Sequence, residues 1–138
     1  MTEVFTDTGG WGAFFGRTEA FHALSRSFIG QWTATGVQVV TTNYVLAELS
    51  ALLHRPLRMS RSQQIIMLDS IRSAQWVEVV HVDPNLDAEA WALFRQHADK
   101  QWNLVDCASF VVMRQRGITD ALTTDRHFEQ AGFRRLLK

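Results

Sequence analysis

Cysteine and proline are scarce in this sequence of 138 residues, which contains one Cys and two Pro. The single thiol, Cys107, excludes a disulfide framework within the chain, fits a reducing compartment and argues against a structural zinc site. No apolar run approaches the roughly 20 residues of a membrane-spanning helix. The N-terminal segment also lacks the basic and apolar regions of a signal peptide. We therefore expect a cytoplasmic protein with no membrane association.

Net charge is absent as well, because 14 Lys and Arg balance 14 Asp and Glu. A value of zero argues at first against a polyanionic partner, since nucleic-acid binders commonly carry a basic excess. The charges are segregated, however: residues 54–75 contain four Arg against one Asp, and residues 76–106 contain six carboxylates against Arg95 and Lys100. This pattern fits a carboxylate site with a cationic rim, and residues 54–75 are a candidate surface for a substrate or partner. Solvated helix faces of mixed charge are the alternative.

Apolar, β-branched segments alternate with amphipathic segments along the sequence. The former predict strands at residues 3–6, 37–41, 76–82 and 121–124, with an edge strand or an apolar tail at 133–137. Apolar spacings of three and four, with capping patterns, predict helices at residues 18–35, 43–53, 60–73, 83–97 and 105–116. Gly9, Gly10 and Gly12 predict a turn after the first strand. This order predicts a single α/β domain over residues 1–138 with a mainly parallel sheet of four to five strands.

Four carboxylates occupy positions that this arrangement makes informative. Asp7 directly follows the first predicted strand and Asp125 directly follows the fourth, so both are expected at the edge of the sheet where ligands bind. Glu48 lies within the helix after the second strand, and Asp106 lies near the start of a strongly apolar helix. An acid in such apolar surroundings is favoured near a helix N-terminus and is otherwise costly to bury without a cation.

Each of these acids also has a purely structural interpretation. Asp7 can accept hydrogen bonds from turn amides, Asp106 and Asp125 can favour helix starts, and Glu48 can pair with Arg55 or Arg58. Together, four carboxylates from four elements repel one another unless a cation compensates them. Hard oxygen ligands of this kind suit Mg²⁺ or Mn²⁺, whereas no paired Cys or His spacing indicates zinc.

Four segments around these acids resemble the motifs of a known family, the PIN-domain ribonucleases, and especially the VapC-type toxins of bacterial toxin–antitoxin pairs. The segments are VFTDTGGW, TTNYVLAELSALL, WNLVDCASFVVMRQRGI and ALTTDRHFEQAGF. The resemblance implies a three-layer α/β/α fold in which Asp7, Glu48, Asp106 and Asp125 are the catalytic residues. It implies that Asp7 and Asp106 hold a Mg²⁺ ion, with Mn²⁺ as an alternative, and that the reaction is cleavage of RNA phosphodiesters. It also implies a cognate antitoxin as partner and a homodimer.

Other residues near the four motifs are secondary candidates. Gly9 stands where many relatives have a hydroxyl residue, so Thr8 is the nearby substitute, and Thr124 or Asn43 can also hydrogen-bond a ligating carboxylate. Asp99 is a candidate for orienting the helix of Asp106, and Asp120 is expected in a turn at the opposite end of its strand.

Arginine and the aromatic residues provide candidates for RNA contacts. Arg126 is a phosphate-binding candidate, with pairing to Asp125 or Glu129 as the equal alternative. Trp11 and Trp102 are expected at the rim of the site, and Trp32, Trp76 and Trp91 are expected in the core. We expect His127 to have a structural role.

Two other classes of function compete with a nuclease. A phosphatase would use Asp7 as a covalent nucleophile at a strand end. That chemistry calls for a second acid two residues later and a lysine near the phosphate, yet position 9 is Gly and the chain has only Lys100 and Lys138. A non-catalytic RNA-binding or partner-binding module with the same fold is the other alternative, and the presence of all four acids argues against it.

Overall fold

The computed structural model describes residues 1–138, and its centre is one sheet of five parallel strands in the order β3-β2-β1-β4-β5. The strands are β1 (Glu3–Thr6), β2 (Gln38–Thr42), β3 (Val77–Val80), β4 (Asp120–Leu122) and β5 (Arg134–Arg135). The helices are α1 (Thr8–Phe15), α2 (His22–Thr35), α3 (Asn43–His54), α4 (Arg61–Ser73), α5 (Pro84–Gln96), α6 (Leu104–Arg116) and α7 (His127–Gln130).

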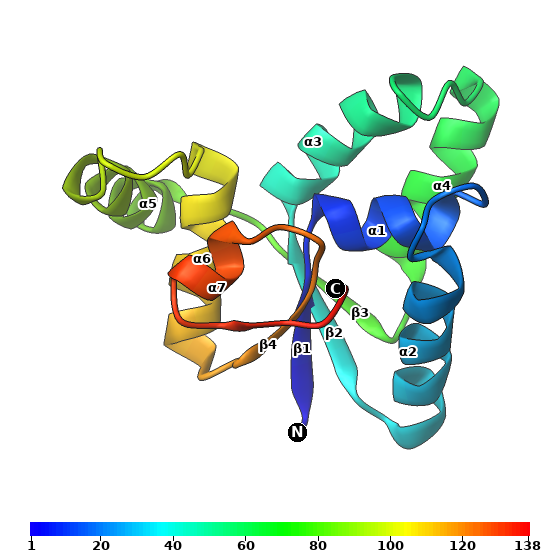
Figure 1. Ribbon diagram of the computed structural model, residues 1–138, viewed down its shortest axis with the longest axis horizontal. Helices are drawn as coiled ribbons and strands as arrows, with labels where there is room; N and C mark the ends of the chain where they lie inside the picture. Colours follow the sequence, from blue (N-terminus) through cyan, green and yellow to red (C-terminus); the bar gives the residue numbers. More distant parts are fainter.

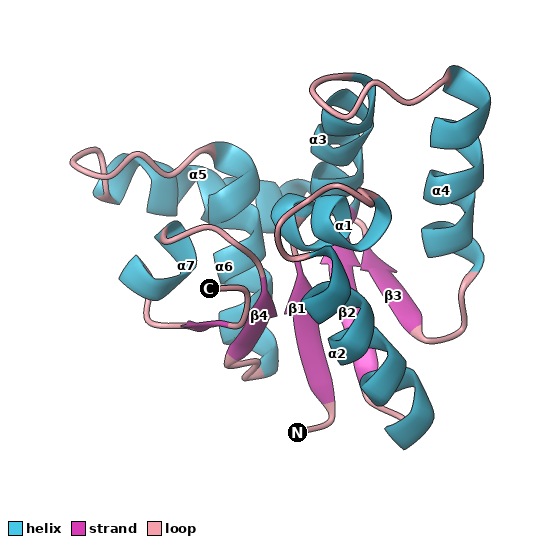
Figure 2. Ribbon diagram, turned by 45° about the vertical axis from the view of Figure 1, so that its right-hand side comes forward, coloured by secondary structure: helices cyan, strands magenta, loops and turns pink.

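Helices cover both sides of this sheet. In Figure 1, α5, α6 and α7 lie on one side of the strands, and α2 and α4 lie on the other. Figure 2 shows α1 and α3 beginning at the upper ends of β1 and β2, which are the carboxyl ends of these strands. The predicted α/β/α architecture with a parallel sheet is therefore confirmed. No helix of the structure combines the length and the apolar character that crossing a membrane requires.

The central position of β1 determines which residues meet at the edge of the sheet. β1 pairs with β2 through Val4 and Val39, and with β4 through Phe5 and Ala121, and all four side chains are fully buried. Because parallel strands end at the same edge, the segments that follow β1 and β4 lie next to each other there. The site described below is built on that edge.

The largest difference from the sequence prediction is the helix α1, which occupies the segment where three glycines predicted a turn. Asp7 is the N-cap of this helix, and its Oδ1 accepts a hydrogen bond from the Gly10 amide at 3.0 Å. A Cβ atom at Gly10 would lie 2.1 Å from the carbonyl oxygen of Leu122 in β4. Gly10 is therefore needed for close packing of α1 against a strand backbone, and the prediction of a glycine turn was wrong.

Replacing Gly10 by Ala is expected to lower the free energy of unfolding by about 3 kcal/mol, because the added methyl group meets backbone that no rotamer change can move. Urea unfolding followed by circular dichroism measures the loss. The matched control is Gly30→Ala in α2, where an added Cβ has no neighbour within 4 Å. This control is expected to raise stability by up to about 1 kcal/mol through helix propensity. Similar values for the two variants would contradict the close-packing role of Gly10.

Helix capping agrees closely with the sequence patterns. Ser60 and Gln63 form the capping box of α4, Asp83 caps α5 with proline at its first position, and Gly36 and Gly117 end α2 and α6 in the left-handed conformation. Several boundaries differ from the prediction, among them those of α2, β3 and β4. α2 begins at His22 rather than near Thr18, β3 is shorter than the predicted segment 76–82, and β4 comprises residues 120–122 instead of 121–124.

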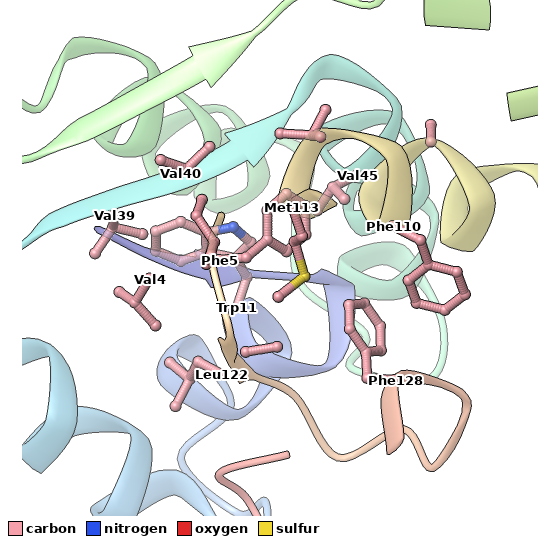
Figure 3. Packing of buried hydrophobic residues seen from close by; sticks show 14 of the residues in the cluster. Val4, Phe5, Trp11, Val39, Val40, Val45, Phe110, Met113, Leu122 and Phe128 are labelled. Carbon is pink, nitrogen blue, oxygen red and sulfur yellow. The ribbon is translucent and has the colours of Figure 1, made fainter. Parts of the chain in front are cut away.

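The tryptophan predictions were partly wrong. Trp11 is fully buried in the core shown in Figure 3, and its Nε1 donates to Thr41 Oγ1 at 3.3 Å. Trp102 is also buried, so neither residue forms the predicted exposed rim. Trp32 is buried as expected, whereas Trp91 is 43% exposed on α5 and is not a core residue. Trp11 and Trp102 therefore belong to the core, and neither offers an exposed face on which an RNA base could stack.

Candidate metal centre

Asp7 lies at the carboxyl end of β1 and is held there by two hydrogen bonds. In addition to the bond from the Gly10 amide, its Oδ2 accepts a hydrogen bond of 2.7 Å from the hydroxyl of Thr123, which follows β4. The side chain is buried, with 7% of the residue exposed. The carboxylate therefore connects the ends of two neighbouring strands and has a fixed orientation.

Burial raises the pKa of Asp7 from its ordinary value of 3.8 to about 7. The negative charges of Asp125 and Asp106 act in the same direction, while the bonds from Thr123 and Gly10 oppose the shift. A buried carboxyl group of this kind is costly to ionise until a cation compensates it. This property is typical of functional sites.

Asp106 belongs to α6, the helix with the largest number of buried residues. It is the third residue of the helix and forms a reciprocal capping box with Asn103, whose amide nitrogen donates to Asp106 Oδ2 at 3.1 Å. The residues that follow it are buried without a break from Cys107 to Met113. Burial raises the pKa of Asp106 to about 6, and the charge of Asp125 contributes to the increase.

Asp125 and His127 complete a compact group with Asp106. The Nδ1 atom of His127 lies 3.1 Å from Asp106 Oδ2 and 3.2 Å from Asp125 Oδ2. One ligand atom from each of the three residues lies within 4.8 Å of the others. Two hydrogen bonds that involve backbone amides hold Asp125 in place. The His127 amide donates to Asp125 Oδ1, and the Asp125 amide donates to Thr123 Oγ1. Thr123 thereby links Asp125 to Asp7.

Glu48 approaches the same edge from α3 and lies outside this compact group. Its Oε1 accepts a hydrogen bond from the hydroxyl of Thr8, and its Oε2 accepts one of 3.3 Å from the side-chain amide of Asn103. Glu48 therefore lies between the start of α1 and the start of α6. The alternative in which it pairs with Arg55 or Arg58 was wrong, because it forms no ion pair with either residue.

The donors at this edge fit a divalent cation. They comprise carboxylate oxygens and one imidazole nitrogen, and the single cysteine is buried beside Asp106 with a pKa raised to about 11, chiefly by burial. Oxygen donors are the ligands of Mg²⁺, and a set that includes imidazole also accommodates Mn²⁺. Asp106, Asp125 and His127 have the separation that one ion requires. Asp7, the other predicted metal ligand, is not part of this group, although its charge interacts with those of Asp125 and Asp106.

Replacing His127 by Asn is expected to weaken Mn²⁺ binding about tenfold and Mg²⁺ binding less, because imidazole is a better ligand for transition metals than for Mg²⁺. Isothermal titration with each ion on the metal-free protein measures the two affinities. The variant Asn43→Ala is a control on another element, since the Asn43 side chain bonds the Val82 amide at 2.7 Å. Equal affinities of His127→Asn and the unaltered protein for both ions would rule out a ligand role for His127.

Several contacts of the site were missed or misassigned from the sequence. Thr123, the residue that bonds both Asp7 and Asp125, was missed, although its neighbour Thr124 was a candidate; the Thr124 side chain forms no hydrogen bond. Asn103 was missed too, although its spacing of three residues from Asp106 is a capping signal. Of the other candidates, Thr8 bonds Glu48, whereas Asn43 contacts no carboxylate of the site.

Two additional acids, Asp99 and Asp120, do not belong to the compact group of ligand atoms. Asp99 is largely exposed and its carboxylate lies 3.8 Å from Lys100 Nζ, and no hydrogen bond joins its side chain to α6. Asp120 is at the predicted end of the strand, opposite the site, but it is the first residue of β4 and is buried near Arg134, so the turn assignment was wrong.

Comparison with known proteins is consistent with this geometry. The sequence matches the PIN domain over residues 4–134. The chain belongs to the PIN-domain family. It is 32% identical over 130 residues to the 23S rRNA-specific endonuclease VapC20 of Mycobacterium tuberculosis, a match that covers 94% of this chain and 95% of the relative. These findings confirm the resemblance to VapC-type PIN proteins and support the prediction of a ribonuclease.

Solved structures show the same fold. The crystal structure of M. tuberculosis VapC20, described as a sarcin-ricin loop cleaving toxin, superposes with a TM-score of 0.85 and covers 98% of this chain and 99% of its own. FitAcB from Neisseria gonorrhoeae gives a TM-score of 0.65 at 13% identity, with 96% of both chains covered. PAE2754 from Pyrobaculum aerophilum gives 0.64 at 16% identity, with 98% of this chain and 84% of that chain covered. The last two support the fold alone.

Proposed function

We propose that this PIN protein is a Mg²⁺-dependent endoribonuclease whose catalytic residues are Asp7, Glu48, Asp106 and Asp125. The observation that carries the proposal is the convergence of Asp106, Asp125 and His127, whose ligand atoms lie within 4.8 Å of one another, with Asp7 linked to Asp125 through Thr123. The raised pKa values of Asp7 and Asp106, which burial causes, agree with a site that a divalent cation compensates. Asp106, with His127 and Asp125, would hold the ion, and Asp7 would face it from β1. Mn²⁺ is the alternative ion.

A bound divalent cation would stabilise the charge that develops on the phosphate and lower the pKa of the attacking water. The residues of the chain orient the reaction. Thr123 fixes Asp7 and Asp125 relative to each other, and Asn103 fixes Asp106 and Glu48. Glu48, held by two hydrogen bonds, orients the attacking water. Attack in line with the 3′-oxygen needs no 2′-hydroxyl nucleophile, so we expect products with a 5′-phosphate.

We propose a structured ribosomal RNA as the substrate class, because VapC20 is a 23S rRNA-specific endonuclease and is similar along almost the whole chain. By the same relationship, we propose that the protein is a toxin that acts in the cytoplasm, is neutralised by a cognate antitoxin and forms a homodimer. We further propose that residues 1–138 form a single nuclease domain.

The phosphatase alternative receives no support from the site. A phosphatase with Asp7 as covalent nucleophile calls for a second acid two residues later. That position is Gly9, and none of the other three acids of the site lies in the same segment. A non-catalytic binding module would have no need for two carboxyl groups that are costly to ionise.

The test is cleavage of an end-labelled RNA hairpin with the sarcin-ricin sequence, compared with a hairpin of the same stem and a scrambled loop. We expect a single cut in the first RNA, dependence on Mg²⁺ or Mn²⁺, inhibition by EDTA and a 5′-phosphate on the downstream product. Cleavage that is unaffected by EDTA would reject the metal-dependent mechanism. Turnover of a small phosphate ester without cleavage of any RNA would favour the phosphatase.

A further inference from the structure

A polar cavity of about 320 Å³ lies directly beside the candidate metal centre. Its walls come from residues 99–101, which connect α5 and α6, and from Asp125, Arg126, His127 and Gln130 after β4. Asp125 and His127 belong to both the cavity and the compact group of ligand atoms. A substrate bound at the metal centre would therefore continue into this cavity.

Arg126 is the free cation of the cavity. Its two candidate partners are already engaged elsewhere: Asp125 Oδ2 lies 3.2 Å from His127, and Glu129 pairs with Arg135 at 3.2 Å and Lys138 at 3.0 Å. The Arg126 side chain is exposed and forms no hydrogen bond or ion pair. No ion pair joins Arg126 to Asp125 or Glu129, although its positive charge contributes, after the hydrogen bond from Lys138, to the lowered pKa of Glu129. The guanidinium is therefore not held by either carboxylate and is available for an external anion.

The chemistry of the cavity walls favours a phosphate over a base. No hydrophobic residue lines the cavity. Unpaired RNA bases are bound mainly by stacking on aromatic side chains. The nearest tryptophan, Trp102, is buried, and its Nε1 donates to Gln130 at 2.9 Å, so it presents no stacking face here. Lys100 adds a second positive charge, offset in part by Asp99 at 3.8 Å.

We propose that this cavity is a subsite for the RNA phosphate adjacent to the scissile one, with Arg126 as its principal binding group. The proposal rests on the nuclease function above and extends it. The planar guanidinium matches two phosphate oxygens at once, which Lys100 cannot do. The subsite positions the RNA backbone relative to the metal centre without taking part in bond cleavage.

The test compares Arg126→Gln with the unaltered protein on the sarcin-ricin hairpin. The variant is expected to raise KM about tenfold while kcat stays within about twofold, since it removes one charge-assisted hydrogen-bond pair to a phosphate. The slope of log KM against log salt concentration is expected to decrease by about 0.7, the value for one phosphate contact on a single strand. Arg126→Lys is expected to restore the salt slope and only part of the affinity.

Arg134→Gln is the matched control, because Arg134 is 73% exposed and lies at the opposite end of the same strands. An unchanged KM and salt slope in Arg126→Gln would overturn the subsite, as would an equal effect of Arg134→Gln. A loss of kcat with weaker metal binding would also overturn it, by showing an indirect effect through Asp125.

A failure of the nuclease proposal can be distinguished from a failure of the phosphate subsite. If the unaltered protein cleaves no RNA, the nuclease proposal fails, and fluorescence anisotropy with the same hairpin still decides the subsite. A Kd about tenfold weaker for Arg126→Gln, with Arg134→Gln unchanged, supports a phosphate subsite. Equal Kd values for both variants and the unaltered protein reject it.

Discussion

Replacing Asp7 by Asn is expected to lower kcat for RNA cleavage by about 1,000-fold, which corresponds to about 4 kcal/mol of transition-state stabilisation. The substitution removes the charge that is proposed to face the cation, and it retains the shape of the side chain. The Asn oxygen can still accept the bond from the Gly10 amide, and Thr123 can accept a bond from the new amide group. The fold should therefore be preserved, and single-turnover cleavage of the labelled hairpin measures the loss.

A second measurement separates this effect from unfolding. Because burial makes the Asp7 charge unfavourable, Asp7→Asn is expected to be more stable than the unaltered protein at pH 7.5 without metal. Asp120→Asn is the matched control, since Asp120 is a buried carboxyl group at the opposite end of the sheet. It is expected to retain activity. Full activity in Asp7→Asn would remove Asp7 from the catalytic site.

Without metal, the free energy of unfolding is expected to fall as the pH rises from about 5 to about 7.5. The pKa of Asp7 is about 7 in the folded protein against an ordinary value of 3.8, so the folded state binds the proton more tightly. The stability from this proton is complete below pH 3.8 and is lost as the pH rises through 7. One pH unit corresponds to about 1.4 kcal/mol, so the loss from Asp7 is about 4 kcal/mol at most.

Urea unfolding in EDTA at pH 5 and pH 7.5 tests this dependence. Asp106 contributes in the same direction, with its pKa raised to about 6. Glu78 acts in the opposite direction, because a hydrogen bond from Arg116 lowers its pKa below 4.5, and the chosen range lies above that value. The decline should be smaller in Asp7→Asn, and Mg²⁺ at pH 7.5 should stabilise the unaltered protein more than the variant. A pH-independent stability would contradict the role of burial at Asp7.

The sequence predicted the positions of the acids well because strand ends are readable from local patterns. Asp7 and Asp125 follow short apolar strands, and parallel strands bring their carboxyl ends to one edge. The hydrogen bonds among them were harder to predict. Thr8 and Asn103 meet Glu48 across separations of 40 and 55 residues, and only the packing of α1, α3 and α6 determines that proximity.

Glycine and tryptophan show why the remaining details could not be predicted. Gly9, Gly10 and Gly12 have low helix propensity, so a local interpretation favours a turn. Tertiary packing overrides that preference, because Gly10 lets α1 approach the backbone of β4. Trp11 and Trp91 have similar apolar neighbours in sequence, yet one is fully buried and the other is 43% exposed. Whether a helix face is covered depends on elements distant in the sequence.

The unbroken burial of α6 limits how this protein can diversify. From Asp106 to Met113 every side chain of the helix is buried, so a change of size at any of these positions disturbs the packing around the site. Changes in target choice are then expected to accumulate elsewhere, in the exposed residues 99–101 and at Arg126, which border the site but carry little of the core. The rigid helix would thus restrict evolutionary change to the loops that surround it.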